Sequence, residues 1–227
     1  MTPRTVTELL DVPQPAWDLL APVVDSSPVT IEVLPVEPDR AADTLLALQV
    51  TVGSVLGALA HRCGGLLVDH GWVRLLGGGS DRMPSLAEAN GLSGVTPGTV
   101  QPDVLVVGHD VLGGQFAVDG GGLGIRAGEA CYWAPDSLTW AGLDLGHGEL
   151  VQAFLQGATT EFYASSRWPG WEDEVSDVDV DQGLSLWPPP FSVEGQDLAT
   201  VSRRAVDLAE LRSFYAEAVA QIDGRGD

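Results

Sequence analysis

Apolar residues in the first fifty positions repeat mostly at helical spacing. In 13–24 they fall on one face, which predicts a helix that starts near Pro15. Alternating apolar residues predict a short strand over 29–35. A second helix is expected over 37–50, where Pro38 suits the first turn. The chain therefore opens with helices around a single strand.

The period changes in the middle of the chain. Residues 54–63 and 64–79 fit either a strand pair or a short helix that leads into a strand. Three strands are then expected over 103–109, 113–119 and 129–135. The links between these strands are too short for a crossover helix, so we expect antiparallel hairpins.

Helical periodicity returns near the end of the chain. Apolar stripes predict helices over 147–157 and 159–167, the second with a threonine cap. A C-terminal helix is expected over 207–223, with Asp207 and Glu210 in a capping-box pattern. These elements predict one α+β domain over 1–227. Its mainly antiparallel sheet is packed with helices from both ends of the chain.

The acidic run over 172–183 is expected to be a solvated loop. Its D-x-D-x-D pattern at 177–181 resembles a calcium loop. An EF-hand needs glycine at the sixth position and glutamate at the twelfth, where this chain has Gln182 and Pro188. We therefore predict no metal site here.

The charge balance limits the partners. The chain of 227 residues carries 32 acidic and 11 basic residues, a formal net charge of −21. Nucleic acids and anionic membranes need a basic face, so neither is expected as a partner. A basic protein would be attracted instead. The alternative is that the acidity only keeps the protein soluble.

The absence of lysine excludes several chemistries. All basic residues are arginine. Walker A loops, Schiff-base enzymes, Ser–Lys hydrolases and protein kinases each need a lysine amine. With no secretory signal pattern and only two cysteines, Cys63 and Cys131, we expect a cytoplasmic protein without structural disulfides.

The glycine-rich stretch GGGLGIRA raises the question of a nucleotide site. It contains the pattern G-x-G-x-x-A over 122–127. A dinucleotide fingerprint needs a helix directly afterwards, but EACYWAP (129–135) is strand-like. We therefore predict a hairpin loop and no cofactor.

The candidates for catalysis are dispersed. Asp69 and His70 are neighbours on an expected strand and would point to opposite faces. The cysteines lie in apolar surroundings, and the four histidines show no zinc spacing. An enzyme or small-ligand site remains open only if Asp69, His70, Asp119 and Asp136 converge in one pocket.

The tryptophans are concentrated in one part of the sequence. Five of the seven lie within 133–187, two of them in RWPGW and one in WPPPF. They form either a second layer of core or an exposed interface patch. The predicted partner-contact residues are Trp72, Arg74, Asp119, Trp133, Asp136, Trp168 and Trp171.

Four phrases give the chain a family resemblance. LLVDHGWVRLLG, DVLGGQFAVDGG, CYWAPDSLTW and RWPGWEDEV resemble a bacterial domain-of-unknown-function family over about residues 10–195. More loosely, 103–157 is similar to the SUKH superfamily, whose α+β domains commonly serve as immunity proteins that neutralise toxins. That resemblance implies an α+β fold, and an inhibitory role by analogy alone, because a fold does not fix a function.

Three hypotheses follow. The first is a non-catalytic cytoplasmic binding protein, of the immunity type, that inhibits a basic toxin. The second is a small-ligand receptor or a lysine-independent hydrolase that uses Asp and His side chains. The third is a domain that buries its aromatic face in a homodimer.

Overall fold

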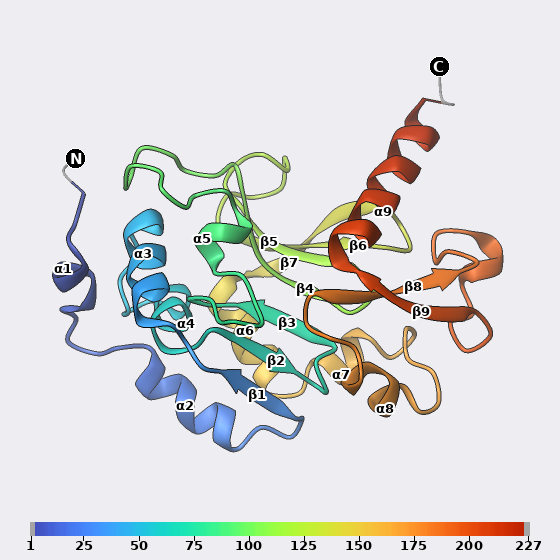
Figure 1. Cartoon of the computed structure of the whole chain (residues 1–227), viewed down its shortest axis with the longest axis horizontal. Helices are drawn as coiled ribbons and strands as arrows, with labels where there is room; N and C mark the ends of the chain where they lie inside the picture. The colour runs from blue at the N-terminus through green and yellow to red at the C-terminus, as the bar shows by residue number, and fades with distance from the viewer. Residues whose placement is uncertain (1–2, 225–227) are drawn as a thin grey trace.

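A seven-stranded antiparallel sheet forms the centre of the protein, and its strands lie side by side in chain order (Figure 1). The computed structural model describes residues 3–224. The strands are β1 (Ile31–Leu34), β2 (Gly65–Val68), β3 (Val73–Leu76), β4 (Val104–Asp110), β5 (Gln115–Asp119), β6 (Glu129–Ala134) and β7 (Thr139–Gly146). A separate two-stranded sheet pairs β8 (Gln182–Trp187) with β9 (Ser202–Asp207).

The helices come from both ends of the chain and from the links between strands. The N-terminal half contains α1 (Val6–Leu10), α2 (Trp17–Asp25), α3 (Pro38–Leu48), α4 (Val55–Arg62) and α5 (Leu86–Ala89). The C-terminal half contains α6 (His147–Leu155), α7 (Thr159–Phe162), α8 (Trp171–Ser176), the 3₁₀ turn η1 (Val193–Gly195) and α9 (Leu208–Asp223). The protein is therefore a single α+β domain, as predicted.

Strand register divides the sheet into two different faces. Leu75, Gly108, Phe116 and Tyr132 are consecutive cross-strand partners, so they share one face. The opposite face carries another cross-strand row, made up of Arg74, His109, Gln115, Trp133 and Trp140. One face is thus apolar at its centre and the other is polar and aromatic.

The apolar face packs against α6 and α7. The Phe116 ring lies 5.2 Å from the Phe154 ring of α6 and 6.0 Å from the Phe162 ring of α7, measured between centroids. Phe116 and Phe154 are both buried. Burial of each such side chain stabilises the fold by about 1.5–3 kcal/mol.

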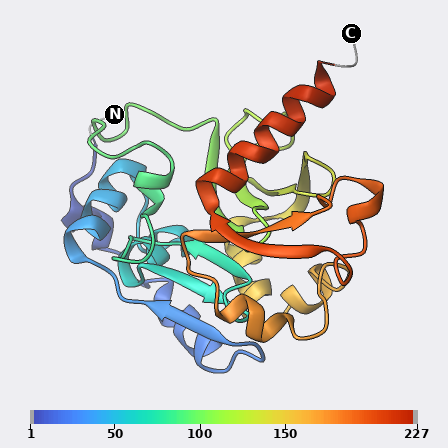
Figure 2. The ribbon, with the colours of Figure 1, turned by 45° about the vertical axis from the view of Figure 1, so that its right-hand side comes forward.

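The β8–β9 hairpin and the start of α9 cover the opposite face. The Leu184 amide donates to the Val111 carbonyl, which attaches β8 to the β4–β5 turn. The Tyr215 hydroxyl of α9 donates to the Leu112 carbonyl at 3.1 Å. The C-terminal half of α9 projects away from the body of the protein (Figure 1, Figure 2).

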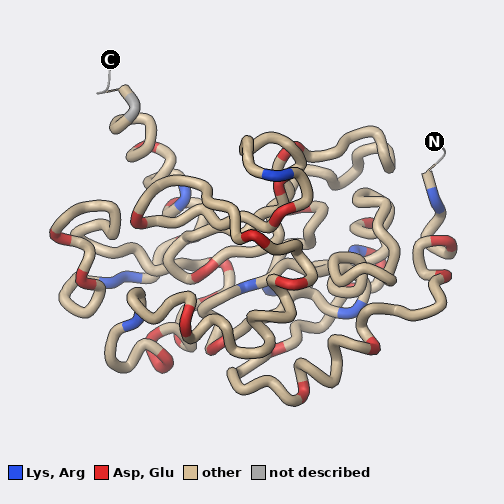
Figure 3. Tube along the Cα trace, turned by 180° about the vertical axis from the view of Figure 1, so that it is seen from behind, with Lys and Arg blue, Asp and Glu red and all other residues tan. Residues whose placement is uncertain are grey.

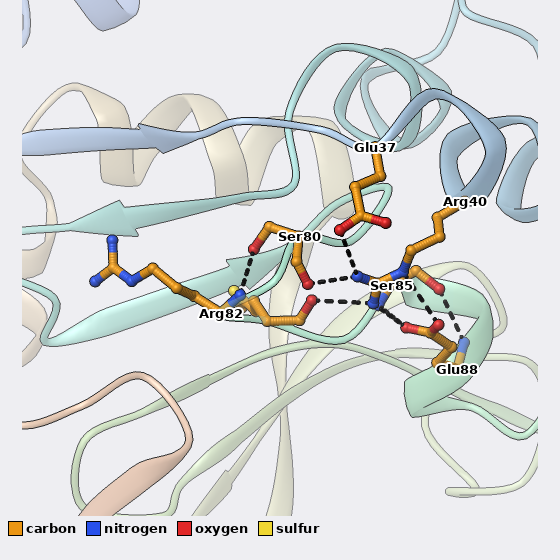
Figure 4. Close-up of polar contacts among 7 residues, drawn as sticks. Glu37, Arg40, Ser80, Arg82, Ser85 and Glu88 are labelled. Carbon is orange, nitrogen blue, oxygen red and sulfur yellow. Dashed lines mark hydrogen bonds and ion pairs between the residues drawn. The ribbon is translucent and has the colours of Figure 1, made fainter.

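An arginine on α3 joins this helix to α5 and to the segment between β3 and α5. The Arg40 guanidinium on α3 donates to the Ser80 and Met83 carbonyls and pairs with the Glu88 carboxylate of α5 (Figure 4). The same Glu88 carboxylate accepts from the Ser85 amide and completes the cap of α5. These polar groups are satisfied by one another, so the cluster holds the fold together.

Several predicted elements are confirmed, and others differ. The three expected strands appear as β4, β5 and β6, and 54–63 follows the helix alternative as α4. The expected 159–167 helix ends at Phe162, and its threonine does not cap it. The C-terminal helix begins as expected, but the Asp207 side chain makes no capping hydrogen bond. Strands β7, β8 and β9 were not predicted.

The acidic segment is not a loop throughout. Its first part forms α8, and its last two residues begin β8. Gly170 precedes α8 in the left-handed conformation with φ at 80°. Acidic residues in the first turn stabilise this helix, because their negative charges lie near the positive end of the helix dipole. Val175 is buried beneath them, which gives this short helix an inner face.

Among residues 3–224, none of the helices combines the length and the apolar character that a membrane crossing requires.

Candidate functional site

Three of the predicted contact tryptophans gather beside the β2–β3 turn. The Trp72 ring centroid lies 5.6 Å from that of Trp168 and 5.2 Å from that of Trp171. The Arg167 guanidinium lies 4.0 Å from the Trp171 ring centroid and pairs with the buried Asp69 carboxylate. Trp72 and Trp168 are buried and Trp171 is half-buried. Trp168 and Trp171 therefore belong to a second layer of core, one of the two interpretations of the tryptophans in 133–187, whereas Trp187 is 68% exposed.

Arg74 also lies inside the protein. Its Nε donates to the Gly71 carbonyl at 3.1 Å, and its Nη1 donates to the carbonyls of Val180 and Gln182. Burial lowers the pKa of the guanidinium to about 10, while the charge of Asp110 acts in the opposite direction. Arg74 therefore ties the β8 hairpin to the sheet and presents no surface to a partner in this conformation.

Asp119 organises the glycine-rich loop. Its carboxylate accepts from the amides of Gly121, Leu123 and Ile125 at 2.7–3.1 Å. The hydrogen bond from the Leu123 amide is the largest of the effects that lower the pKa of this carboxyl. Strands β5 and β6 pair on either side of the loop. The sequence GGGLG is therefore the hairpin loop that the sequence predicts.

The four side chains of the hydrolase hypothesis do not converge. Asp69 and His70 lie in the β2–β3 turn with φ at 57° and 61°, so the expectation that they occupy a strand is wrong. Asp119 ends β5, and Asp136 lies in the β6–β7 turn. A shared acid–base site would need these groups within hydrogen-bond reach of one substrate. We therefore drop the catalytic arrangement built on them.

One of the predicted residues, Asp136, lines a pocket of about 380 Å³. Its walls come from four parts of the chain: Leu112, the end of β6 with its turn (Tyr132 and 134–137), the region of α7 (162–166) and the loop around η1 (190–198). Trp133 lies on the opposite face of the sheet, where its ring is 5.5 Å from that of Tyr215. The structure thus separates two residues that the sequence places three positions apart.

A buried carboxylate lies behind two of the pocket's aromatic walls. Asp110 Oδ2 accepts from the hydroxyls of Tyr132 at 2.6 Å and Tyr163 at 3.0 Å. Its Oδ1 accepts from the amides of Leu112 and Gly114, both at 2.9 Å. Burial raises the pKa of Asp110, and these four donors oppose that effect. The fixed donors match an ionised carboxylate, which only accepts hydrogen bonds.

Sequence reasoning did not select Asp110, Tyr132 or Tyr163. The two tyrosines lie 22 and 53 positions from the aspartate, so no local motif connects them. A partial signal was present in HDVLGG, because an aspartate before a glycine pair is typical of a side chain that caps its own turn.

Neither cysteine is suited to act as a nucleophile. Both cysteines are buried free thiols, and burial raises the pKa of Cys63 to about 12 and that of Cys131 in the same direction. A buried thiol with a raised pKa is a poor nucleophile. Within residues 3–224, no three His, Cys, Asp or Glu side chains are arranged to hold a metal ion.

Arginines are largely used inside the protein or in ion pairs. Five of them pair with acidic side chains: Arg40, Arg82, Arg126, Arg167 and Arg203. In contrast, acidic positions are spread along the helices and loops (Figure 3). Five exposed acidic residues lie within ten positions on α8 and the segment after it: Glu172, Asp173, Asp177, Asp179 and Asp181. The net charge therefore belongs mainly to the surface.

Comparison with known proteins gives the family. A family model described as "Protein of unknown function DUF2625" matches residues 6–211. The chain is 32% identical over 212 residues to the uncharacterized protein YbfG of Escherichia coli K12, covering 92% of this chain and 94% of YbfG. It is also 32% identical over 186 residues to an uncharacterized protein of Haemophilus influenzae, covering 82% of each. No solved structure matches the chain. The phrases that suggested a bacterial family of unknown function are thereby explained: the chain belongs to the DUF2625 family.

Proposed function

We propose that the protein is a non-catalytic binding protein whose acidic surface recognises a basic protein. The observation that carries this proposal is the distribution of charge. The net charge is −21, and half of the ten described arginines are paired with acids of the same chain. An acidic surface of this kind speeds encounter with a basic partner and repels nucleic acids.

An immunity-type role is the form of binding that we favour. The loose similarity of 103–157 to the SUKH superfamily supports it, because domains of that superfamily commonly neutralise toxins. The dispersal of Asp69, His70, Asp119 and Asp136 over the β2–β3 turn, the end of β5 and the β6–β7 turn also supports binding without catalysis. In this proposal the protein blocks a basic toxin in the cytoplasm of the cell that makes it.

Capture of a partner at two salt concentrations tests the proposal. Tagged protein is incubated with lysate of the native host at about 0.15 M and 1 M salt, where the Debye lengths are about 8 Å and 3 Å. We expect a basic protein at equal stoichiometry that is lost at high salt. The captured protein is then purified, and its activity is measured with and without the binding protein. A captured partner that is acidic, or a complex that is indifferent to salt, contradicts the proposal.

Charge variants then locate the surface on the purified pair. Glu172, Asp173, Asp177 and Asp179 are converted together to their amides. The matched control converts four exposed acids of α1 to α3: Asp11, Asp18, Asp25 and Asp39. Because loss of steering slows association, we expect the first set to reduce the association rate by about tenfold or more and the control to do so much less. Equal effects would contradict a binding surface at α8.

Self-association is a second candidate function, and exposed apolar side chains favour it. Trp187 at the end of β8 is 68% exposed, Val193 of η1 is 81% exposed and Ile222 of α9 is 53% exposed. Exposed apolar groups of this size are typical of interfaces when they form a patch. Light scattering over a range of concentrations tests this candidate. A monomer at every concentration would eliminate it.

A further inference from the structure

The pocket beside α7 has a chemistry that points to one class of ligand. Among its described lining residues, Asp136 is the only charged one, and it is exposed at the rim. The Asp136 carboxylate makes no hydrogen bond or ion pair within residues 3–224, so its charge is available to a ligand. The other polar groups of the lining are hydroxyls and one side-chain amide, from residues such as Ser137, Ser166 and Gln196.

A second negative charge lies deeper. The Asp110 carboxylate is separated from the pocket by the rings of Tyr132 and Tyr163, whose hydroxyls donate to it. The Asp110 side chain is fully buried and does not belong to the pocket lining. Asp136 is therefore the carboxylate that a ligand meets at the pocket surface.

Aromatic rings form the apolar part of the wall. The Phe162 ring is 37% exposed and lies 5.2 Å from the Tyr132 ring in an edge-on arrangement. It also lies 4.8 Å from the Tyr163 ring. Aromatic faces next to an anion are favourable for an organic cation, since the ring quadrupole and the carboxylate both attract positive charge.

We propose that this pocket binds an alkylguanidinium or alkylammonium group. The cation pairs with the Asp136 carboxylate, its alkyl stem packs against Phe162 and Tyr132, and the serine hydroxyls accept its remaining N–H groups. An anionic ligand would meet Asp136 and no cation among the lining residues. This inference rests on the proposed function in one respect: a basic partner supplies such groups as arginine and lysine side chains.

Small probes test the pocket without any partner. N-acetyl-arginine N-methylamide and butylguanidinium are titrated into the full protein by calorimetry and by NMR. N-acetyl-citrulline N-methylamide serves as the neutral analogue of nearly the same shape. We expect saturable binding of both guanidinium probes, with at least about tenfold weaker binding of the citrulline compound. Equal binding of the charged and neutral probes overturns the proposal, as does the absence of saturable binding.

Variants place the probes in the pocket. Asp136→Asn removes the rim charge, and its side chain makes no hydrogen bond in the described structure. We expect about tenfold weaker probe binding, equivalent to about 1.4 kcal/mol. Asp25→Asn on α2 is the matched control, because it changes the net charge equally and should leave binding unchanged. Phe162→Leu retains an apolar side chain but loses the ring, and should also weaken binding. Unaltered binding in Asp136→Asn would overturn the proposal.

The source of the cation is decided with the purified partner. If Asp136→Asn weakens both probe and partner binding, the pocket takes an arginine or lysine side chain of the partner. If it weakens only probe binding, the pocket takes a free small cation, and the proposal for the pocket still holds. If the probes bind but the basic partner is not captured, or its capture does not depend on salt, the proposed function is overturned and the proposal for the pocket holds.

Discussion

Removing the hydroxyl of Tyr163 should destabilise the protein more than removing that of Tyr215. Both tyrosines are 2% exposed, and each hydroxyl makes one hydrogen bond to an oxygen at about the same distance. The Tyr163 hydroxyl donates to the Asp110 carboxylate at 3.0 Å, whereas the Tyr215 hydroxyl donates to the Leu112 carbonyl at 3.1 Å. The pair therefore compares a charged acceptor with a neutral one in the same chain.

The expected losses of stability follow from the charge of each acceptor. A hydrogen bond to a charged group contributes about 1.5–3 kcal/mol, and one to a neutral group about 0.5–1.5 kcal/mol. Tyr163→Phe should therefore lower the free energy of unfolding by about twice as much as Tyr215→Phe. In a protein of this size, 1 kcal/mol corresponds to about 2–4 °C in Tm, so Tyr163→Phe should lower Tm by about 3–12 °C.

Urea unfolding followed by tryptophan fluorescence measures both variants. The buried rings of Trp72 and Trp168 report on the core directly. A shift in midpoint with an unchanged m-value shows that stability alone has changed. The reasoning is refuted if Tyr215→Phe costs as much as Tyr163→Phe. It is refuted as well if Tyr163→Phe costs less than about 0.5 kcal/mol, the range of an ordinary surface change.

Three further predictions concern pH, packing and a cation–π contact. Burial lowers the pKa of His147 to about 4 and that of His109 well below its usual value. The unfolded chain therefore binds more protons than the folded one below pH 6.5. Each histidine should cost on the order of 1 kcal/mol of stability per pH unit between pH 6.5 and 5.5, measured by urea unfolding at each pH. A Cβ at Gly114 would clash with the buried Asp110 carboxylate, whereas a Cβ at Gly53 would make only ordinary van der Waals contacts. Gly114→Ala should therefore cost about 1–3 kcal/mol in thermal unfolding and Gly53→Ala less than 1 kcal/mol. Arg167→Lys keeps the positive charge but removes the guanidinium that lies over the Trp171 ring. It should lower the free energy of unfolding, measured in urea, by about 1 kcal/mol.

The central strands were predictable because their local signals agree. Strands β4, β5 and β6 are rich in β-branched and aromatic residues and are separated by glycine turns. Strand β7 was missed because Gly142 and Asp144 interrupt its pattern, and Asp144 has φ at 59°. Strand β9, with the sequence SRRAVD, is mostly polar because only Val206 on it is buried. Pairing with β8 gives that segment its strand conformation.

The pocket was harder to predict than the fold. Asp136 was selected from the sequence, but its role depends on aromatic rings that line the same pocket from β6 and from the region of α7. No spacing rule places Phe162 beside Tyr132, since they lie thirty positions apart and meet only when α7 packs on the sheet. Hydrophobic period identifies elements, whereas convergence of side chains depends on how those elements pack.

The distribution of arginine connects the fold to the proposed binding role. Arg74 holds the β8 hairpin by donating to backbone carbonyls, and Arg167 and Arg203 pair with acids while lying over tryptophan rings. These guanidinium groups satisfy internal acceptors and contribute little positive charge to the surface. The pocket beside α7 receives no cation from the described chain, although Asp136 lies free at its rim. The guanidinium or ammonium group that we propose for this pocket would therefore come from outside the described chain, and the net charge of −21 favours the proposed basic partner as its source.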